Sequence, residues 1–294
     1  MQTLSNRLLY GLAVCALRGL ARLPCGLAYW LGARLGDLLY LMLAERRRIT
    51  LANLALAFGT DKTTAERRWL ARTTFRNLGH HLVDFSHLSQ LTPSTFATMC
   101  HVEGREHIEA LLQRRMGLLV LSAHFGSWEL APAMALCLTT PVHVIVRPLD
   151  NPALQRLAEA YRQRCGYRAI PRRAALTECL KVLRRGEIVA VLMDQSGLRR
   201  ESVQVEFFGT KAYTSVGPAL LALRTGCPVV SAFLIRAGQG CHRLVFSPEI
   251  PVRRTGNVQQ DIVENTREFT HIIESYVRRY PDHWFWLHRR WKQR

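Results

Sequence analysis

Lysine and acidic residues are both scarce in this chain of 294 residues. Of its 40 basic residues all but Lys62, Lys181, Lys211 and Lys292 are arginine, and only 22 acidic residues oppose them, which leaves a formal net charge of +18. Such an excess predicts an anionic partner, which can be nucleic acid, lipid headgroups or an acidic or phosphorylated substrate. Arginine suits this task because its planar fork binds phosphate and carboxylate at two points. The 48% of hydrophobic residues excludes a disordered chain.

Motifs for several common chemistries are also missing. The eight cysteines form no CxxC pair, which argues against the usual zinc spacings and favours buried thiols in a reducing compartment. Without GxSxG there is no serine nucleophile elbow, and without GxxxxGK[ST] or GxGxxG no nucleotide cofactor is implied. His80, Asp84 and His87 share one helix face, which we interpret as a polar stripe rather than a metal site. The sequence therefore predicts neither metal nor cofactor.

No apolar run near the N-terminus reaches the roughly 20 residues that cross a bilayer. The runs at 8–17 and 23–33 are separated by Arg18 and Arg22. This pattern favours one or two amphipathic helices lying in a membrane interface, with Arg46, Arg47 and Arg48 beside anionic lipid. A buried helical hairpin and a tilted span with snorkelling arginines are the alternatives.

The rest of the chain is predicted to form an α/β fold. Residues 1–90 have helical patterns, whereas from about residue 100 short apolar runs alternate with helical segments. The strand candidates are 117–122, 142–146, 188–193, 203–207, 229–235 and 242–246, and the helix candidates are 126–138, 152–165, 173–185, 214–225 and 257–280. This alternation predicts a mixed, mostly parallel central sheet flanked by helices.

The most informative segment follows the strand candidate at 117–122. Open α/β sheets bind ligands at the carboxyl ends of their strands, so His124 is expected at the ligand-binding edge of the predicted sheet. Gly126 permits a tight turn, Ser127 suits a helix N-cap, and Glu129 lies where the chain can fold back onto the imidazole. We therefore predict a His124–Glu129 dyad that removes a proton from a substrate hydroxyl, without a covalent enzyme intermediate. In the alternative, Glu129 only complements a helix dipole.

These residues also carry a family resemblance. His124-Phe-Gly-Ser-Trp-Glu129 resembles the H-X4-D/E motif of glycerolipid acyltransferases and, more closely, the HFGxWE form of the lipid A biosynthesis lauroyl/myristoyl acyltransferases. Further similar blocks follow in family order over about residues 5–294. They are Arg46–Arg48 before Asn53-Leu54, Val146-Arg147-Pro148 before Asn151-Pro152, Met193-Asp194-Gln195, Phe207-Phe208-Gly209 through Thr214, and Trp286 through Lys292.

The resemblance implies an enzyme that moves a fatty acyl chain from acyl carrier protein to a hydroxyl of a Kdo-containing lipid A precursor. It also implies a glycerolipid acyltransferase-like fold and a place on the cytoplasmic face of the bacterial inner membrane, with its anionic lipids as partners and no nucleic acid. On this basis we divide the chain into a membrane-associating helical segment, 1–45, and an acyltransferase domain, 46–294.

The other blocks supply candidate binding residues. Arg147 is expected to stabilise an oxyanion or bind a substrate phosphate. Asp194 is expected to orient Arg147 or a substrate sugar, with a structural cap as the alternative. Gln195, Phe208, Gly209 and Thr214 complete the candidate substrate-binding set, although core packing explains the phenylalanines equally well. At the C-terminus Arg289 and Arg290 alternate with Trp284, Phe285, Trp286 and Trp291, a pattern that suits a bilayer interface.

Two other functions fit parts of this pattern. The same dyad would serve another glycolipid acceptor, such as a phosphatidylinositol mannoside, or a lysophospholipid. A basic nucleic-acid-binding protein would also explain the charge and the aromatic residues. The sequence contains no recognisable nucleic-acid-binding module, and this second alternative leaves the apolar N-terminus unexplained.

Overall fold

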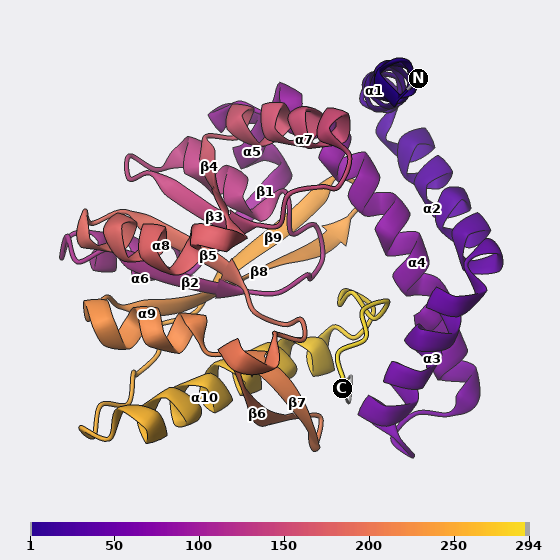
Figure 1. Ribbon diagram of the computed structural model, residues 1–294. Coiled ribbons are helices and arrows are strands. Elements are labelled where there is room, and N and C mark those ends of the chain that lie inside the picture. Colours follow the sequence, from indigo (N-terminus) through magenta and orange to yellow (C-terminus); the bar gives the residue numbers. More distant parts are fainter. Residues whose placement is uncertain (1, 292–294) are drawn as a thin grey trace.

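The computed structural model describes residues 2–291 and is built around a seven-stranded sheet (Figure 1). The sheet order is β1-β9-β8-β2-β5-β3-β4, and within it only the β8–β9 pair is antiparallel. The strands are β1 (Cys100–Glu103), β2 (Leu118–Ser122), β3 (Val142–Val146), β4 (Tyr167–Pro171), β5 (Ile188–Leu192), β8 (Val229–Gly238) and β9 (Cys241–Phe246). The prediction of a mixed, mostly parallel sheet is confirmed.

Alternate residues of the central strands face two separate layers, as a pleated strand requires. Leu119 and Leu121 of β2 pack with one layer, and Leu118 and Val120 pack with the other. The first layer contains α8 (Ala175–Arg184), α9 (Gly217–Thr225) and α10 (Val258–Arg279). The second contains α5 (Pro93–Met99), α6 (Arg105–Leu112) and α7 (Pro152–Arg164). Because both faces are covered, β2 is buried along most of its length.

Two helix predictions need correction. The segment predicted as a helix at 126–138 forms turns and then a 3-10 helix, η2 (Ala131–Cys137). Pro132 would have stood inside that predicted helix, where it cannot donate a backbone hydrogen bond. The helix predicted from residue 214 begins only at Gly217, because 210–215 is a strand.

That strand belongs to a separate hairpin, which consists of β6 (Ser202–Phe207) and β7 (Thr210–Ser215). Phe208 and Gly209 form its two-residue turn, with φ values of 54° and 68°. Positive φ at both central residues is the conformation of a type I′ turn, whose twist matches the flanking strands. Gly209 is therefore explained by the turn it occupies.

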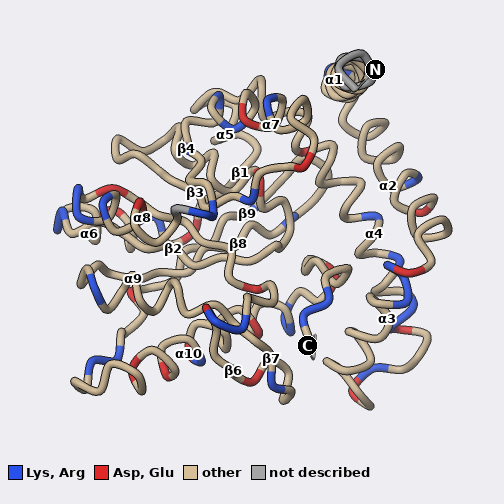
Figure 2. Tube along the Cα trace, in the orientation of Figure 1, with Lys and Arg blue, Asp and Glu red and all other residues tan. Residues whose placement is uncertain are grey.

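The N-terminal helices lie along one side of the sheet (Figure 1). They are α1 (Gln2–Leu20), α2 (Cys25–Met42), α3 (Ala44–Phe58) and α4 (Thr64–His87). The backbones of α2 and α4 approach so closely that a Cβ added at Gly79 would lie 1.9 Å from the Gly32 carbonyl oxygen. Figure 2 shows few charged residues along α2 and a group of basic residues near the start of α3, where the sequence has three consecutive arginines at 46–48.

The described N-terminal helices individually fall short of a membrane span. Within residues 2–291, no single helix is both long and apolar enough to cross a bilayer. Helices α2 and α3 together have the length and apolar composition of a membrane span, but the chain bends by 94° between them. The outer faces of α1–α3 nevertheless expose large apolar side chains, among them Leu27, Trp30, Leu38, Leu41 and Met42.

Candidate active site

The loop that follows β2 is held between β8 and the C-terminal segment. The Phe285 N–H donates to the His124 carbonyl at 3.0 Å, and the Gly126 N–H donates to the His283 carbonyl at 2.9 Å. Gly126 has a φ of 57°, and a Cβ there would lie 1.9 Å from the Leu234 carbonyl oxygen of β8. Only glycine fits this approach, so the position of His124 depends on it.

His124 and Asp194 meet at the carboxyl edge of the sheet. The His124 Nδ1 atom lies 2.9 Å from Asp194 Oδ1. Strands β2 and β5 are parallel neighbours in which Ser122 pairs with Leu192, so residues two positions beyond each strand reach the same level. The Trp284 indole N–H donates to the other carboxylate oxygen at 2.8 Å. Both oxygens of Asp194 are therefore fixed.

The electrostatics of this pair favour a charged carboxylate and a basic imidazole. Burial alone would lower the pKa of His124, but the charge and hydrogen bond of Asp194 raise it above its ordinary value. Burial would raise the pKa of Asp194, yet the opposite charge and the hydrogen bond of His124 lower it. The Asp194 side chain is 1% exposed and that of His124 is 24% exposed. No described residue bonds His124 Nε2, which leaves this nitrogen available to a substrate.

Glu129 has different partners from those predicted. Its Oε1 accepts from Arg162 Nη2 at 2.5 Å, and its Oε2 accepts from Arg162 Nε and the Tyr167 hydroxyl, each at 3.0 Å. The predicted hydrogen bond between Glu129 and His124 is therefore wrong, because the turn at 128–130 directs this carboxylate toward α7 and β4. Its charge still contributes to the raised pKa of His124. Burial raises the pKa of Glu129, but Arg162 lowers it by more, so Glu129 remains ionised.

An open cavity of about 1100 Å³ begins beside this site. His124, Trp128 and Glu129 line it, and the apolar side chains of β2, β3 and β5 line it further in. Those apolar residues include Val120, Val142, Val144, Ile188 and Ala190. Leu244 and Phe246 of β9 also contribute. A cavity that combines these apolar strand residues with polar and charged groups suits a ligand with an alkyl chain and a polar head.

Two further predicted binding residues line the same cavity. Arg147 follows β3, has a 75% exposed side chain and lies 3.5 Å from Asp150. Gln195 lies directly after Asp194. The described partners of Asp194 are His124 and Trp284, so the expectation that it orients Arg147 is wrong. Five arginines absent from the predicted set also line the cavity, namely Arg162, Arg172, Arg173, Arg199 and Arg200.

The remaining candidates lie outside the described lining of this cavity. Phe208 and Gly209 form the hairpin turn, where the Phe208 N–H donates to Glu274 at 2.6 Å. Thr214 is fully buried, and its hydroxyl accepts from Arg290 at 2.5 Å. Its neighbours Tyr213 and Ser215 line the cavity instead. The alternation of side chains along β7 explains this outcome.

The C-terminal residues are mostly internal. Trp284, Trp286 and Arg290 are each at most 1% exposed. Arg290 donates to the Tyr213 carbonyl at 2.6 Å, and burial lowers its pKa to about 10. The predicted membrane contact of Arg290 is therefore wrong, since a guanidinium bonded inside the chain cannot reach a headgroup. Arg289 is exposed and pairs with Glu45.

Two arginines of the basic run at the start of α3 bond to backbone carbonyls of neighbouring segments. Arg46 lies 3.5 Å from the Leu287 carbonyl, and Arg47 donates to the carbonyls of Tyr40 and Leu41. Arg46 and Arg48 are exposed. Arg47 therefore holds the turn between α2 and α3 and Arg46 contacts the C-terminal segment, while the side chains of Arg46 and Arg48 remain open to solvent.

Comparisons with known proteins agree with the motif at His124. The family described as bacterial lipid A biosynthesis acyltransferase matches residues 2–293. The chain is 28% identical to the lipid A biosynthesis palmitoleoyltransferase of Escherichia coli (strain K12), over 93% of this chain and 87% of that protein. It is also 28% identical to the lauroyltransferase of the same strain, over 93% and 88%. A phosphatidylinositol mannoside acyltransferase of Mycobacterium tuberculosis is 24% identical over 65% of this chain and 59% of its own length.

Proposed function

Because the chain belongs to the bacterial lipid A biosynthesis acyltransferase family, we propose that it transfers a fatty acyl chain from acyl carrier protein to a hydroxyl of a Kdo-containing lipid A precursor. The observation that supports this most directly is the His124–Asp194 pair beside an open cavity of about 1100 Å³ that the apolar side chains of β2, β3 and β5 line in part. An acyl thioester can place its alkyl chain in the cavity and its carbonyl beside His124. The acceptor hydroxyl then approaches Nε2.

The reaction needs no covalent enzyme intermediate. His124 Nε2 takes the proton of the acceptor hydroxyl while the oxygen attacks the thioester carbonyl. The resulting oxyanion collapses, the C–S bond breaks, and the imidazolium returns its proton to the departing thiolate. Asp194 holds the Nδ1–H tautomer and stabilises the imidazolium. Glu129 fixes Arg162 and adds negative charge near the imidazole.

Arg147 is assigned to the anionic headgroup of the acceptor. Its side chain is 75% exposed, and an oxyanion donor works best where water is excluded. Arg172 and Arg199 bring further positive charge from two other segments that line the cavity. A phosphate placed among these groups would be bound through charge-assisted hydrogen bonds.

The exposed apolar surface of α1–α3 is assigned to the cytoplasmic face of the inner membrane. Trp30 is 55% exposed and Met42 is 68% exposed, and both belong to α2. An amphipathic helix with such residues binds a membrane by burying its apolar face at the headgroup boundary. The arginines at 46–48 and the overall charge of +18 would add attraction to anionic lipid.

Acyl transfer with purified protein tests the proposal. Acyl carrier protein thioesters of several chain lengths are offered with the tetra-acylated precursor, and product mass is measured for the wild type and for His124→Ala. We expect a gain of one acyl chain that the variant abolishes. Phosphatidylinositol mannoside and lysophospholipid acceptors are run in parallel, because one relative bears the former name. Transfer only to these acceptors would show that the acceptor is not the lipid A precursor. No transfer from any donor would refute the proposed reaction.

A further inference from the structure

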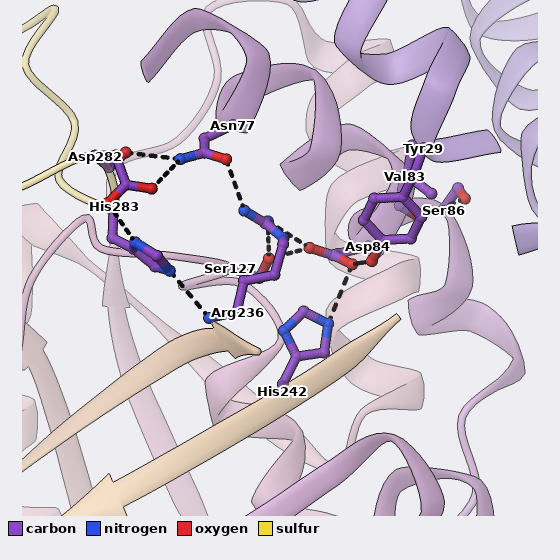
Figure 3. A network of polar contacts seen from close by, with 10 residues as sticks. All are labelled: Tyr29, Asn77, Val83, Asp84, Ser86, Ser127, Arg236, His242, Asp282 and His283. Atoms are coloured by element: carbon purple, nitrogen blue, oxygen red, sulfur yellow. Dashed lines mark hydrogen bonds and ion pairs between the residues drawn. The ribbon is translucent and has the colours of Figure 1, made fainter. Parts of the chain in front are cut away.

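A buried polar cluster includes Ser127, which belongs to the same loop as His124 (Figure 3). Its members come from five separate elements: Tyr29 of α2, Asp84 of α4, Ser127 of the loop, Arg236 of β8 and His242 of β9. Asp84 is 1% exposed and Ser127 is fully buried. We call these five residues the Asp84 cluster. None of them takes part in the reaction proposed above.

Asp84 lies at the centre of the cluster. Its Oδ2 lies 2.8 Å from Arg236 Nη2 and accepts a hydrogen bond from the Ser127 hydroxyl. Its Oδ1 accepts from the Tyr29 hydroxyl and lies 3.2 Å from His242 Nε2. Burial would raise the pKa of Asp84, but His242 and Arg236 hold it well below its usual range. Asp84 is therefore an ionised carboxylate inside the protein, and the charge of Arg236 balances its own.

Arg236 connects the cluster to the loop from two directions. Its Nη2 donates to Ser127 Oγ at 2.7 Å, and its backbone N–H donates to His283 Nε2 at 3.2 Å. The carbonyl of that same His283 accepts from the Gly126 N–H. Gly126 and Ser127 are therefore both tied, directly or through one residue, to Arg236. His124 lies only three positions before Ser127.

The need for such support follows from the loop itself. Between Ser122 and Ala131 the chain forms turns and one isolated bridge, so no helix or strand ladder fixes it. Stability alone is a weak reason for the cluster, because a buried ion pair often contributes little net stability compared with apolar side chains of similar volume. A displacement of 1 Å at a reacting group, by contrast, can lower a rate by roughly 100-fold.

We propose that Asp84 and Arg236 are positioning residues that act through the Ser127 hydroxyl to hold His124 in line with Asp194 and the substrate. This inference rests on the proposed function, since it assigns a purpose to the orientation of His124. The sequence patterns suggested other uses, namely a helix cap for Ser127 and a polar stripe along one helix face for Asp84. Both residues instead point inward and bond to each other.

Ser127→Ala is the primary test because it removes one hydroxyl and leaves the packing nearly unchanged. We expect kcat to fall 10- to 100-fold, while KM for the acyl donor and the thermal unfolding midpoint remain close to the wild-type values. Amide hydrogen exchange of residues 123–130 should become faster in the unliganded protein. Asp84→Asn should produce the same changes more strongly and also lower the unfolding midpoint.

Asp37→Asn provides a matched control. Asp37 is another shielded carboxylate, 9% exposed, and it ties α2 to α4 through Arg72 and Arg76 at 2.7 and 2.8 Å. It should lower the unfolding midpoint without changing kcat or loop exchange. Wild-type kcat and exchange in Ser127→Ala would overturn the proposal, as would faster loop exchange in Asp37→Asn equal to that of Asp84→Asn. If the wild type transfers no acyl group, the proposed function fails, and loop exchange alone decides whether the cluster positions the loop.

Discussion

Replacing Asp194 with asparagine tests which carboxylate serves His124. The motif predicted Glu129 as its partner, whereas the structure places Asp194 against the imidazole. In the wild type Trp284 donates to Oδ2 while Oδ1 faces His124 Nδ1. An asparagine would keep its oxygen toward the indole N–H and turn its amide N–H₂ toward the imidazole. Nδ1 would then have to accept a hydrogen bond, so the ring proton would move to Nε2. That nitrogen is the one needed as the base.

The expected loss of kcat can be judged from the strength of the His124–Asp194 interaction and from what a general base contributes to a rate. Unit charges separated by the 2.9 Å of this pair attract each other by ~6 kcal/mol at an effective dielectric constant near 20. Desolvation of the two groups offsets part of this energy. A general base contributes roughly 10²- to 10⁴-fold to a rate, and we expect kcat to fall within that range. The fold should persist because the two side chains have nearly the same shape.

The pH dependence gives a second, independent readout. Asp194 raises the pKa of His124 in the wild type, and the base works only when it is deprotonated, so kcat/KM should rise as pH increases through that raised pKa. Without the carboxylate the pKa falls, and the acidic limb should move to lower pH while the plateau drops. Acyl transfer measured from pH 5 to 9 would show this, with the exposed Asp61→Asn as charge control. A plateau within tenfold of wild type and an unmoved limb would refute the assignment.

Three further outcomes follow from the site and its surroundings. Glu129→Gln leaves the buried Arg162 without its charge partner, so the free energy of unfolding should fall by about 3 kcal/mol in chemical denaturation; an unchanged midpoint would contradict this. Ala190→Phe narrows the apolar cavity, so product masses should shift to shorter acyl chains, and the same chain preference would count against an acyl site there. Trp30→Glu should weaken flotation with anionic vesicles by roughly tenfold, whereas Val258→Glu, at another exposed apolar position, should not; equal effects would remove α2 from the membrane surface.

The central strands were predictable because each is a continuous apolar run. The segments at 118–122, 142–146 and 188–192 have little polar interruption, as expected for parallel strands covered on both faces. The missed strand β4 is an edge strand with Arg168 in its second position, so its pattern resembled a loop. The missed strand β7 follows Phe208-Gly209, a pair that does not have the usual hairpin-turn composition.

Part of the site was accessible to the same reasoning. His124 follows a buried strand, and its place at the carboxyl edge was predicted. Its partner was not, because His124 and Asp194 are 70 positions apart, and only the adjacency of β2 and β5 brings them together. The burial of Arg162 and Arg290 was also missed. Both are arginines that local sequence places among exposed charges, and it is distant carboxylate and carbonyl partners that draw them inside.

The spacing of the H-X4-E motif has a different meaning once these partners are known. Glu129 contacts Arg162 and Tyr167, yet its charge still raises the pKa of His124, which lines the same cavity. A carboxylate that is ionised by its own arginine can stabilise a nearby imidazolium without orienting it. In the proposed mechanism Glu129 would therefore act on His124 through its charge, while Asp194 would supply the direct contact and control the tautomer. In the proposed reaction the two carboxylates would therefore differ in role, because Asp194 pairs with the imidazole itself whereas Glu129 pairs with Arg162.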